Sequence, residues 1–213
     1  MITPERFWNH RALSYDDMVG PMYEDAYDKT AALSLKYLRP TDHVLEFACG
    51  TGIVTLAVAP HVSHVRAIDI SGEMVDRARA KMARCGLTNV EVTQTDLFDP
   101  SLLPGSFDVV TAFNVLLYVD NFDAVMARIR ELLKPGGVFL SATDCLGGNF
   151  SKAAIQKFWR SHTGKMPYVG FFTQKSLIQK IARCGFEVLE TENLFPSPPN
   201  LFIAAQKSEE APE

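Results

Sequence analysis

The chain has 213 residues, of which 47% are hydrophobic and 22% are charged, and its formal net charge is −4. This length is enough to bury a full core in one α/β domain, and no apolar run approaches the roughly 18 residues of a membrane span. The net negative charge disfavours nucleic acid as a partner, because phosphate binding needs a basic surface.

The N-terminal residues and the cysteines indicate the compartment. The opening MITPERFWNHR lacks the apolar stretch of a secretory leader. The four cysteines are scattered, with no CxxC pair and no histidines at zinc-ligand spacing. We therefore expect a cytoplasmic protein with reduced thiols and no metal.

Residues 1–40 contain two helical patterns ahead of the first predicted strand. After them, short β-branched runs alternate with turns and helical patterns, which predicts a mostly parallel sheet covered on both faces. The runs that we predict to be strands are 43–47, 65–70, 90–94, 107–113, 138–143, 186–194 and 201–206.

Two of the later helices carry recognisable ends. Residues 122–133 form a wide apolar stripe, with Asp120 as the predicted N-cap and Lys134-Pro135-Gly136-Gly137 as the stop. Thr173 is predicted to cap a further helix that stops near Gly185.

The last two strands are too close together for a helical crossover. Only residues 195–200 separate them, and parallel neighbours need a dozen or more connecting residues. The sequence therefore predicts a doubly wound α/β sheet of seven strands, mostly parallel, with one antiparallel strand.

Residues 145–172 interrupt the alternation after the fifth strand. Ligands of open α/β sheets bind beyond the carboxyl ends of the strands, so this insertion is placed over the site. We expect one domain over 1–213, with a helical lid at 1–40 and the insertion as a roof. The insertion is rich in aromatic residues, namely Phe150, Phe158, Trp159, Tyr168, Phe171 and Phe172.

The strongest motif is Glu46-Phe47-Ala48-Cys49-Gly50-Thr51-Gly52, where a buried strand enters a glycine turn followed by a helix at 53–59. Glycine lets the backbone adopt positive φ and approach a ligand closely. Asp69 ends the next strand, where an acid binds ribose hydroxyls, and Asp96 follows the third strand. Together these residues predict a nucleoside site.

This set of motifs resembles the class I S-adenosylmethionine-dependent methyltransferases, especially the small-molecule branch with the ubiquinone and menaquinone methyltransferases. The resemblance covers nearly the whole chain, including Phe107-Asp108-Val109-Val110 and Leu133-Lys134-Pro135-Gly136-Gly137. It implies a Rossmann-like methyltransferase fold with S-adenosylmethionine as cofactor and S-adenosylhomocysteine as product. Many members have glycine at the position of Ala48, and alanine is common in the small-molecule branch.

The resemblance also implies a role for each matching residue. Asp69 would bind the ribose hydroxyls, Asp96 the adenine amino group, and Glu46 the methionine ammonium. Tyr15 would close over the cofactor. The remaining positions are the backbone cradle of Ala48, Gly50 and Gly52, the adenine contacts of Ile70, Met74 and Leu97, and the methionine contacts of Phe113 and Asn114.

Two other functions stay open. A nicotinamide-dependent oxidoreductase uses a related turn, but here the third glycine of that pattern is missing, and Glu46 would repel a pyrophosphate. A non-catalytic nucleoside-binding module would have the same motifs without turnover.

The acceptor is less well defined than the cofactor. The aromatic insertion favours a small apolar or aromatic acceptor, and the stretch Asn114-Val115-Leu116-Leu117 differs from the Asn-Pro-Pro-Tyr of enzymes that methylate adenine or glutamine amides. His162 and His10 are possible bases, but a surface role explains both. We assign no catalytic residue, no methylated atom and no oligomeric state.

Overall fold

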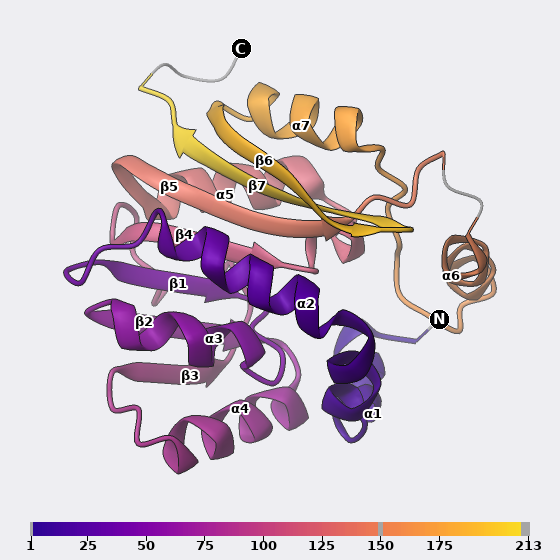
Figure 1. Cartoon of the computed structure of the whole chain (residues 1–213), viewed down its shortest axis with the longest axis horizontal. Coiled ribbons are helices and arrows are strands. Elements are labelled where there is room, and N and C mark those ends of the chain that lie inside the picture. Colours follow the sequence, from indigo (N-terminus) through magenta and orange to yellow (C-terminus); the bar gives the residue numbers. More distant parts are fainter. Residues whose placement is uncertain (1, 149–150, 210–213) are drawn as a thin grey trace.

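The computed structural model describes residues 2–148 and 151–209. Within these residues, seven strands form one sheet in the order β3-β2-β1-β4-β5-β7-β6 (Figure 1). This confirms the predicted seven-stranded α/β sheet. The strands are β1 His43–Phe47, β2 His64–Asp69, β3 Val90–Gln94, β4 Phe107–Phe113, β5 Leu133–Asp144, β6 Phe186–Pro196 and β7 Pro199–Lys207.

The direction of the strands follows from the lengths of their connections. Strands β1 to β5 are parallel, and β7 runs antiparallel to both β5 and β6, as the short link before it predicts. The strand order reverses between β1 and β4, where the chain crosses to the other half of the sheet. Open α/β sheets bind their ligands at the carboxyl side of such a switch point.

The helices begin and end close to the predicted signals, with one correction. Thr173 Oγ1 accepts from the Ser176 backbone N–H at 3.0 Å and caps its helix as predicted. Asp120 is not the cap of the other helix, because that helix starts at Phe122 and the preceding residue, Asn121, accepts from Ala124 N–H instead. The helices are α1 Pro4–Ala12, α2 Tyr15–Leu35, α3 Ile53–Val58, α4 Gly72–Arg84, α5 Phe122–Leu132, α6 Lys152–His162 and α7 Gln174–Arg183, with short 3₁₀ turns η1 Ala59–His61 and η2 Leu116–Tyr118.

Two hydrophobic cores lie on opposite faces of the sheet. Alternation along β1 sends Val44 into the core beneath α2, α3 and α4, and Leu45 into the core beneath α5 and α7. Figure 1 shows α2 and α3 in front of the sheet, α5 behind it and α4 below β3. With both faces covered, polar groups reach a ligand only at the strand ends.

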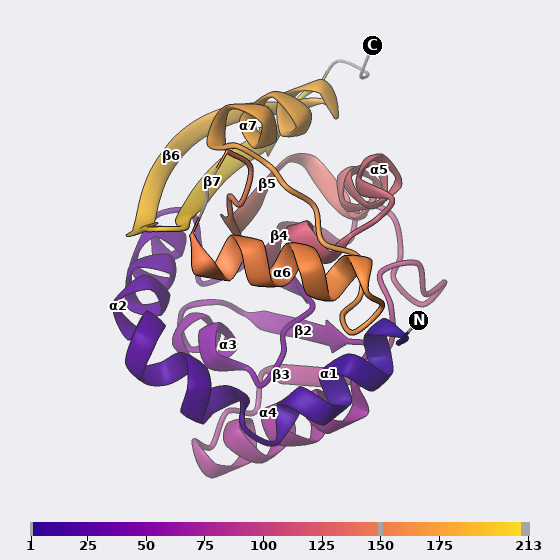
Figure 2. The same cartoon turned by 90° about the vertical axis from the view of Figure 1, so that its right-hand side faces the viewer.

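The carboxyl ends of the strands are crossed by two helices from distant parts of the chain. Viewed end-on, α1 and α6 lie in front of the sheet (Figure 2). Within residues 2–148 and 151–209, none of the helices has the length and apolar character needed to cross a bilayer.

Candidate active site

The turn after β1 contains three residues in the left-handed backbone region. Ala48, Gly50 and Gly52 have φ values of 59°, 55° and 78°. Glycine adopts this conformation without cost, whereas alanine loses about 1–2 kcal/mol there. The glycine found at the position of Ala48 in many methyltransferases therefore has a conformational reason.

Gly52 packs closely against α4. A Cβ added at Gly52 would lie 2.9 Å from Met82 Cε and 3.2 Å from Ala78 Cβ, both on α4. Gly52 does not line either of the two cavities described below. The structure therefore gives this glycine a packing role, whereas the sequence predicts a contact with the cofactor.

Asp69, at the end of β2, joins the turn to the next helix. Its Oδ2 accepts from the Gly50 N–H at 2.9 Å, and its Oδ1 accepts from the Ser71 N–H at 2.8 Å. Burial raises the pKa of Asp69, while these backbone hydrogen bonds oppose the rise. Each carboxylate oxygen has a second lone pair, so Asp69 can still accept from a ligand hydroxyl.

Glu46 is buried beneath the same turn. Its Oε2 accepts from the Thr55 hydroxyl at 2.6 Å. Burial, together with the negative charge of Asp69, raises the pKa of Glu46 to about 7, although the Thr55 hydrogen bond opposes this. Asp69 and Asp96 line one of the two cavities described below. Glu46 lines neither of them, because it is buried beneath the turn.

A cavity of about 250 Å³ opens above this turn, and we call it the Asp69 cavity. It lies at the carboxyl ends of β1, β2 and β4 and includes the loop after β3. Ten of the twelve predicted cofactor residues line it. They are Tyr15, Ala48, Gly50, Asp69, Ile70, Met74, Asp96, Leu97, Phe113 and Asn114.

The chemistry of these residues fits an adenosyl amino acid. Asp69 and Asp96 supply acceptors for hydroxyl and amino hydrogens, and Asp96 is exposed, with one oxygen already accepting from the Phe98 N–H at 2.7 Å. Ile70 and Leu97 supply apolar contact for a planar base. The left-handed backbone at Gly50 leaves open space where a side chain would stand, so a ligand can approach the main chain there.

The first two helices are fastened to this region by polar contacts. Asn9 Oδ1 accepts from the Ser71 hydroxyl at 2.6 Å, which ties α1 to the start of α4. Asp16 Oδ1 accepts from the Thr51 hydroxyl at 2.6 Å, and Asp16 also pairs with Lys81 at 2.7 Å. These contacts place the neighbouring Tyr15 at the edge of the Asp69 cavity.

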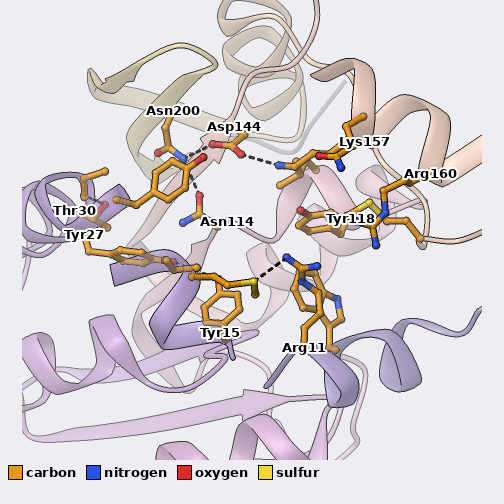
Figure 3. Close-up of a pocket in the computed structure, with 18 of the residues that line it drawn as sticks. Arg11, Tyr15, Tyr27, Thr30, Asn114, Tyr118, Asp144, Lys157, Arg160 and Asn200 are labelled. Atoms are coloured by element: carbon orange, nitrogen blue, oxygen red, sulfur yellow. Dashed lines mark hydrogen bonds and ion pairs between the residues drawn. The ribbon is translucent and has the colours of Figure 1, made fainter. Parts of the chain in front are cut away.

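A second cavity, of about 470 Å³, lies next to the first, and we call it the Asp144 cavity (Figure 3). Helices α1, α2 and α6 and the carboxyl ends of β4 and β5 contribute to it, as does the start of β7. Trp8, Tyr15, Asn114 and Tyr118 line both cavities. These four residues therefore mark the junction between the two spaces.

A polar network runs along one side of the Asp144 cavity. Asn200 Nδ2 donates to Asn114 Oδ1 at 2.8 Å and to Asp144 Oδ1 at 2.9 Å. Lys157 Nζ pairs with Asp144 Oδ2 at 2.9 Å, as drawn in Figure 3. Burial opposes the charge of Lys157, but Tyr118 and Asp144 outweigh it and raise the pKa of Lys157. This network joins β4, β5, β7 and α6.

The sequence indicates little of this second cavity. Its Asp144 ends a strand, which is the one signal that points to it. Arg11, Lys157, Arg160 and Asn200 lie in helices or at a strand start without a recognisable motif.

The aromatic residues of the insertion do not form the expected lining. Phe158, Trp159, Tyr168 and Phe171 are exposed, Phe172 is buried in the core, and none of the five lines either cavity. Phe150 lies outside the described residues. The aromatic residues that do line the Asp144 cavity come instead from the first two helices and from η2, and they are Trp8, Tyr15, Tyr23, Tyr27 and Tyr118.

Comparison with known proteins finds similarity to methyltransferases. A family described as a methyltransferase domain matches residues 44–137. The chain is 27% identical over 143 residues to a carboxy-S-adenosyl-L-methionine synthase from Dichelobacter nodosus, which covers 64% of this chain and 60% of that protein. It is 26% identical over 201 residues to a demethylmenaquinone methyltransferase from Symbiobacterium thermophilum, covering 89% and 77%.

The fold is shared with solved structures. A protein from Methanosarcina mazei described among SAM-dependent methyltransferases superposes with a TM-score of 0.68 at 21% identity, over 84% of this chain and 98% of that one. These similarities support a class I S-adenosylmethionine-dependent methyltransferase, the class whose cofactor is S-adenosylmethionine. It spans less than two thirds of the Dichelobacter protein.

Proposed function

We propose that this protein transfers the methyl group of S-adenosylmethionine to a small-molecule acceptor bound in the Asp144 cavity. One observation carries the proposal: Trp8, Tyr15, Asn114 and Tyr118 line both cavities. A ligand in one cavity therefore adjoins a ligand in the other. When bound, S-adenosylmethionine supplies an electrophilic methyl group on a positively charged sulfur.

The residues of the Asp69 cavity would hold the cofactor. Asp69 would accept from the ribose hydroxyls, and Asp96 would accept from the adenine amino group. Ile70, Met74 and Leu97 would pack against the adenine ring. The backbone of Ala48 and Gly50, with that of Phe113 and Asn114, would contact the amino-acid end.

The helices that cross the carboxyl ends of the strands would exclude water from the bound ligands. We assign this role to the lid at 1–40 and the insertion at 145–172, within one domain over 1–213. The contacts of Asn9 with Ser71 and of Asp16 with Thr51 support the lid. The ion pair of Lys157 with Asp144 fastens the insertion to β5. Holding the reactants in line within a closed site can supply roughly 7–11 kcal/mol of a barrier.

The acceptor would be small and would carry an aromatic ring. A volume of about 470 Å³ suits a single small molecule. The aromatic side chains of the cavity support a ring, together with the apolar side chains of Leu117 and Met166. The quinone-directed name of the Symbiobacterium relative is consistent with such an acceptor.

Asp69→Asn tests the cofactor site. The amide keeps the size of the side chain but removes the charge, so the affinity for S-adenosylhomocysteine should fall by about 10- to 100-fold, since hydrogen bonds to a charged group contribute about 1.5–3 kcal/mol. Isothermal titration calorimetry of a variant with an unchanged circular dichroism spectrum measures this. Unchanged affinity in the folded variant would remove Asp69 from the proposed site.

The same titration with NADH separates the two enzyme classes. We expect S-adenosylhomocysteine to bind and NADH not to bind. Turnover is then measured with S-adenosylmethionine and a panel of phenols, amines and quinols. Tight binding of NADH without a response to S-adenosylhomocysteine would instead support an oxidoreductase.

A further inference from the structure

We infer that the acceptor is a small aromatic acid, whose anionic oxygen group binds between Arg11 and Arg160 in the Asp144 cavity. This inference rests on the proposed function, which makes the ligand of this cavity the methyl acceptor. The presence of an anion site depends only on the residues of the cavity.

The described lining of the Asp144 cavity is strongly basic. Four of its side chains are cationic, namely Arg11, Lys152, Lys157 and Arg160, and Asp144 is its one carboxylate. The whole chain has the opposite charge, with a formal net charge of −4. Positive charge is therefore concentrated in this cavity against the general balance of the protein, and a cavity of one sign attracts ligands of the other.

The single carboxylate is already neutralised. Asp144 pairs with Lys157 through one oxygen and accepts from Asn200 through the other. Within the described residues, neither Asp144 oxygen forms a hydrogen bond or an ion pair with Arg11 or Arg160. The Asp144–Lys157 pair thus contributes no net charge, and the excess positive charge belongs to the two arginines and to the exposed Lys152.

The two arginines lack a protein anion as partner. In the part of the chain that the structure describes, neither Arg11 nor Arg160 forms an ion pair with a carboxylate. Arg11 lies 4.0 Å from the Met18 sulfur and 5.6 Å from the centroid of the Phe7 ring. Both arginines are half-buried. Partly desolvated guanidinium groups without an anion favour binding one from solution.

The arginines are also placed beside an aromatic ring. Figure 3 shows Arg11 from α1 and Arg160 from α6 on the same side of the cavity as Tyr118. Burial raises the pKa of Tyr118, while the charges of Lys157 and Arg11 oppose the rise, so the field of Arg11 reaches this phenol. Because Tyr118 also lines the Asp69 cavity, an anion held by the arginines would leave the far end of a ring near the junction.

A planar carboxylate fits these donors best. Guanidinium groups bind carboxylates through two parallel hydrogen bonds, which fixes the orientation of the ligand as well as its affinity. The tyrosines of α2 and the Trp8 ring provide the aromatic surface for the remainder of the molecule. We therefore assign an aromatic carboxylate to the cavity, with its nucleophilic group directed toward the junction.

Calorimetry with matched probes tests the assignment. Para-hydroxybenzoate is titrated against para-hydroxybenzamide, its neutral counterpart, with and without saturating S-adenosylhomocysteine. We expect the acid to bind at least about 10-fold more tightly than the amide. Arg11→Met and Arg160→Met should each remove most of that difference and leave the affinity for the amide within about 2-fold. Arg6→Met, an exposed cation on α1 that lines neither cavity, is the matched control.

Each result distinguishes the inference from the proposed function. Equal binding of acid and amide, or an acid affinity that neither arginine variant changes, would overturn the aromatic acid. The same holds if inorganic phosphate binds through the arginines and the carboxylate does not. If Arg11→Met weakens S-adenosylhomocysteine alone, the arginine belongs to the cofactor site and the inference fails. Arginine-dependent binding of the acid without any binding of S-adenosylhomocysteine would keep the anion site and refute the methyltransferase function.

Discussion

Among single residues, Glu46 has a pKa that burial moves into the neutral range. It is buried, and its pKa of about 7 lies well above the 4.5 of an ordinary glutamate. Ionising Glu46 therefore costs more free energy in the folded state than in the unfolded state. Between pH 4.5 and about 7, Glu46 is protonated in the folded state and ionised in the unfolded state. The free energy of unfolding therefore falls as pH rises through this range.

Glu46→Gln is expected to stabilise the ligand-free protein at alkaline pH. Glutamine keeps an acceptor for the Thr55 hydroxyl and has no charge to desolvate. At pH 8 the free energy of unfolding should rise by up to ~3 kcal/mol, the equivalent of the pKa shift, and at pH 4 it should change little. Urea denaturation at both pH values measures this. A gain of the same size at pH 4 would contradict the titration of Glu46 as its cause.

At the scale of elements, the turn after β1 depends on which residues occupy its left-handed positions. Gly52 packs so closely on α4 that a Cβ there would lie 3.2 Å from Ala78 Cβ, whereas Ala48 already has a Cβ at φ 59°. Gly52 is therefore needed for packing against α4, whereas Ala48 adopts a left-handed backbone conformation that is less favourable for alanine than for glycine. Both positions determine how α3 and α4 meet beneath the site.

Gly52→Ala should lower the free energy of unfolding by about 2–4 kcal/mol, because left-handed strain and overpacking against α4 add together. Ala48→Gly should maintain or raise it by up to about 1 kcal/mol, since it relieves the strain alone. Thermal and urea denaturation of both variants gives the comparison. Gly86→Ala, at φ 67° with open space around it, is the control for backbone strain without a clash.

At the scale of the whole molecule, the sheet and its covering helices form the two cavities together. The first two helices, the glycine turn and α6 come from separate parts of the sequence, and the strand ends bring them to one side of the sheet (Figure 2). A ligand in the Asp69 cavity would contact several of these elements at once. Binding there should therefore stabilise the global fold and not a single loop.

S-adenosylhomocysteine at about 100 times its dissociation constant should stabilise the folded state by about 2.7 kcal/mol. For a chain of this size, that corresponds to a rise of about 5–10 °C in Tm. Differential scanning calorimetry measures it, with NADH at the same concentration as the control. A rise with NADH and none with S-adenosylhomocysteine would argue against the cofactor assignment.

The sequence by itself determined where the strands lie, which of them run parallel or antiparallel, and which residues form the glycine turn. Alternating β-branched runs and helical stripes are local patterns, and the short link before β7 requires an antiparallel return. Asp69 and Asp96 were predictable because the carboxyl ends of parallel strands meet at one edge of a sheet. These features depend on neighbours within a few residues along the chain.

Only the tertiary structure decided the Asp144 cavity, the packing role of Gly52 and the position of Glu46 behind the site. Asn200 and Asn114 are 86 residues apart and meet through a hydrogen bond, while Arg11 and Arg160 enter one cavity from distant parts of the chain. Such contacts have no period or spacing in the sequence. They arise because the sheet brings its strand ends together and the helices then cross them, so their charges combine only after folding.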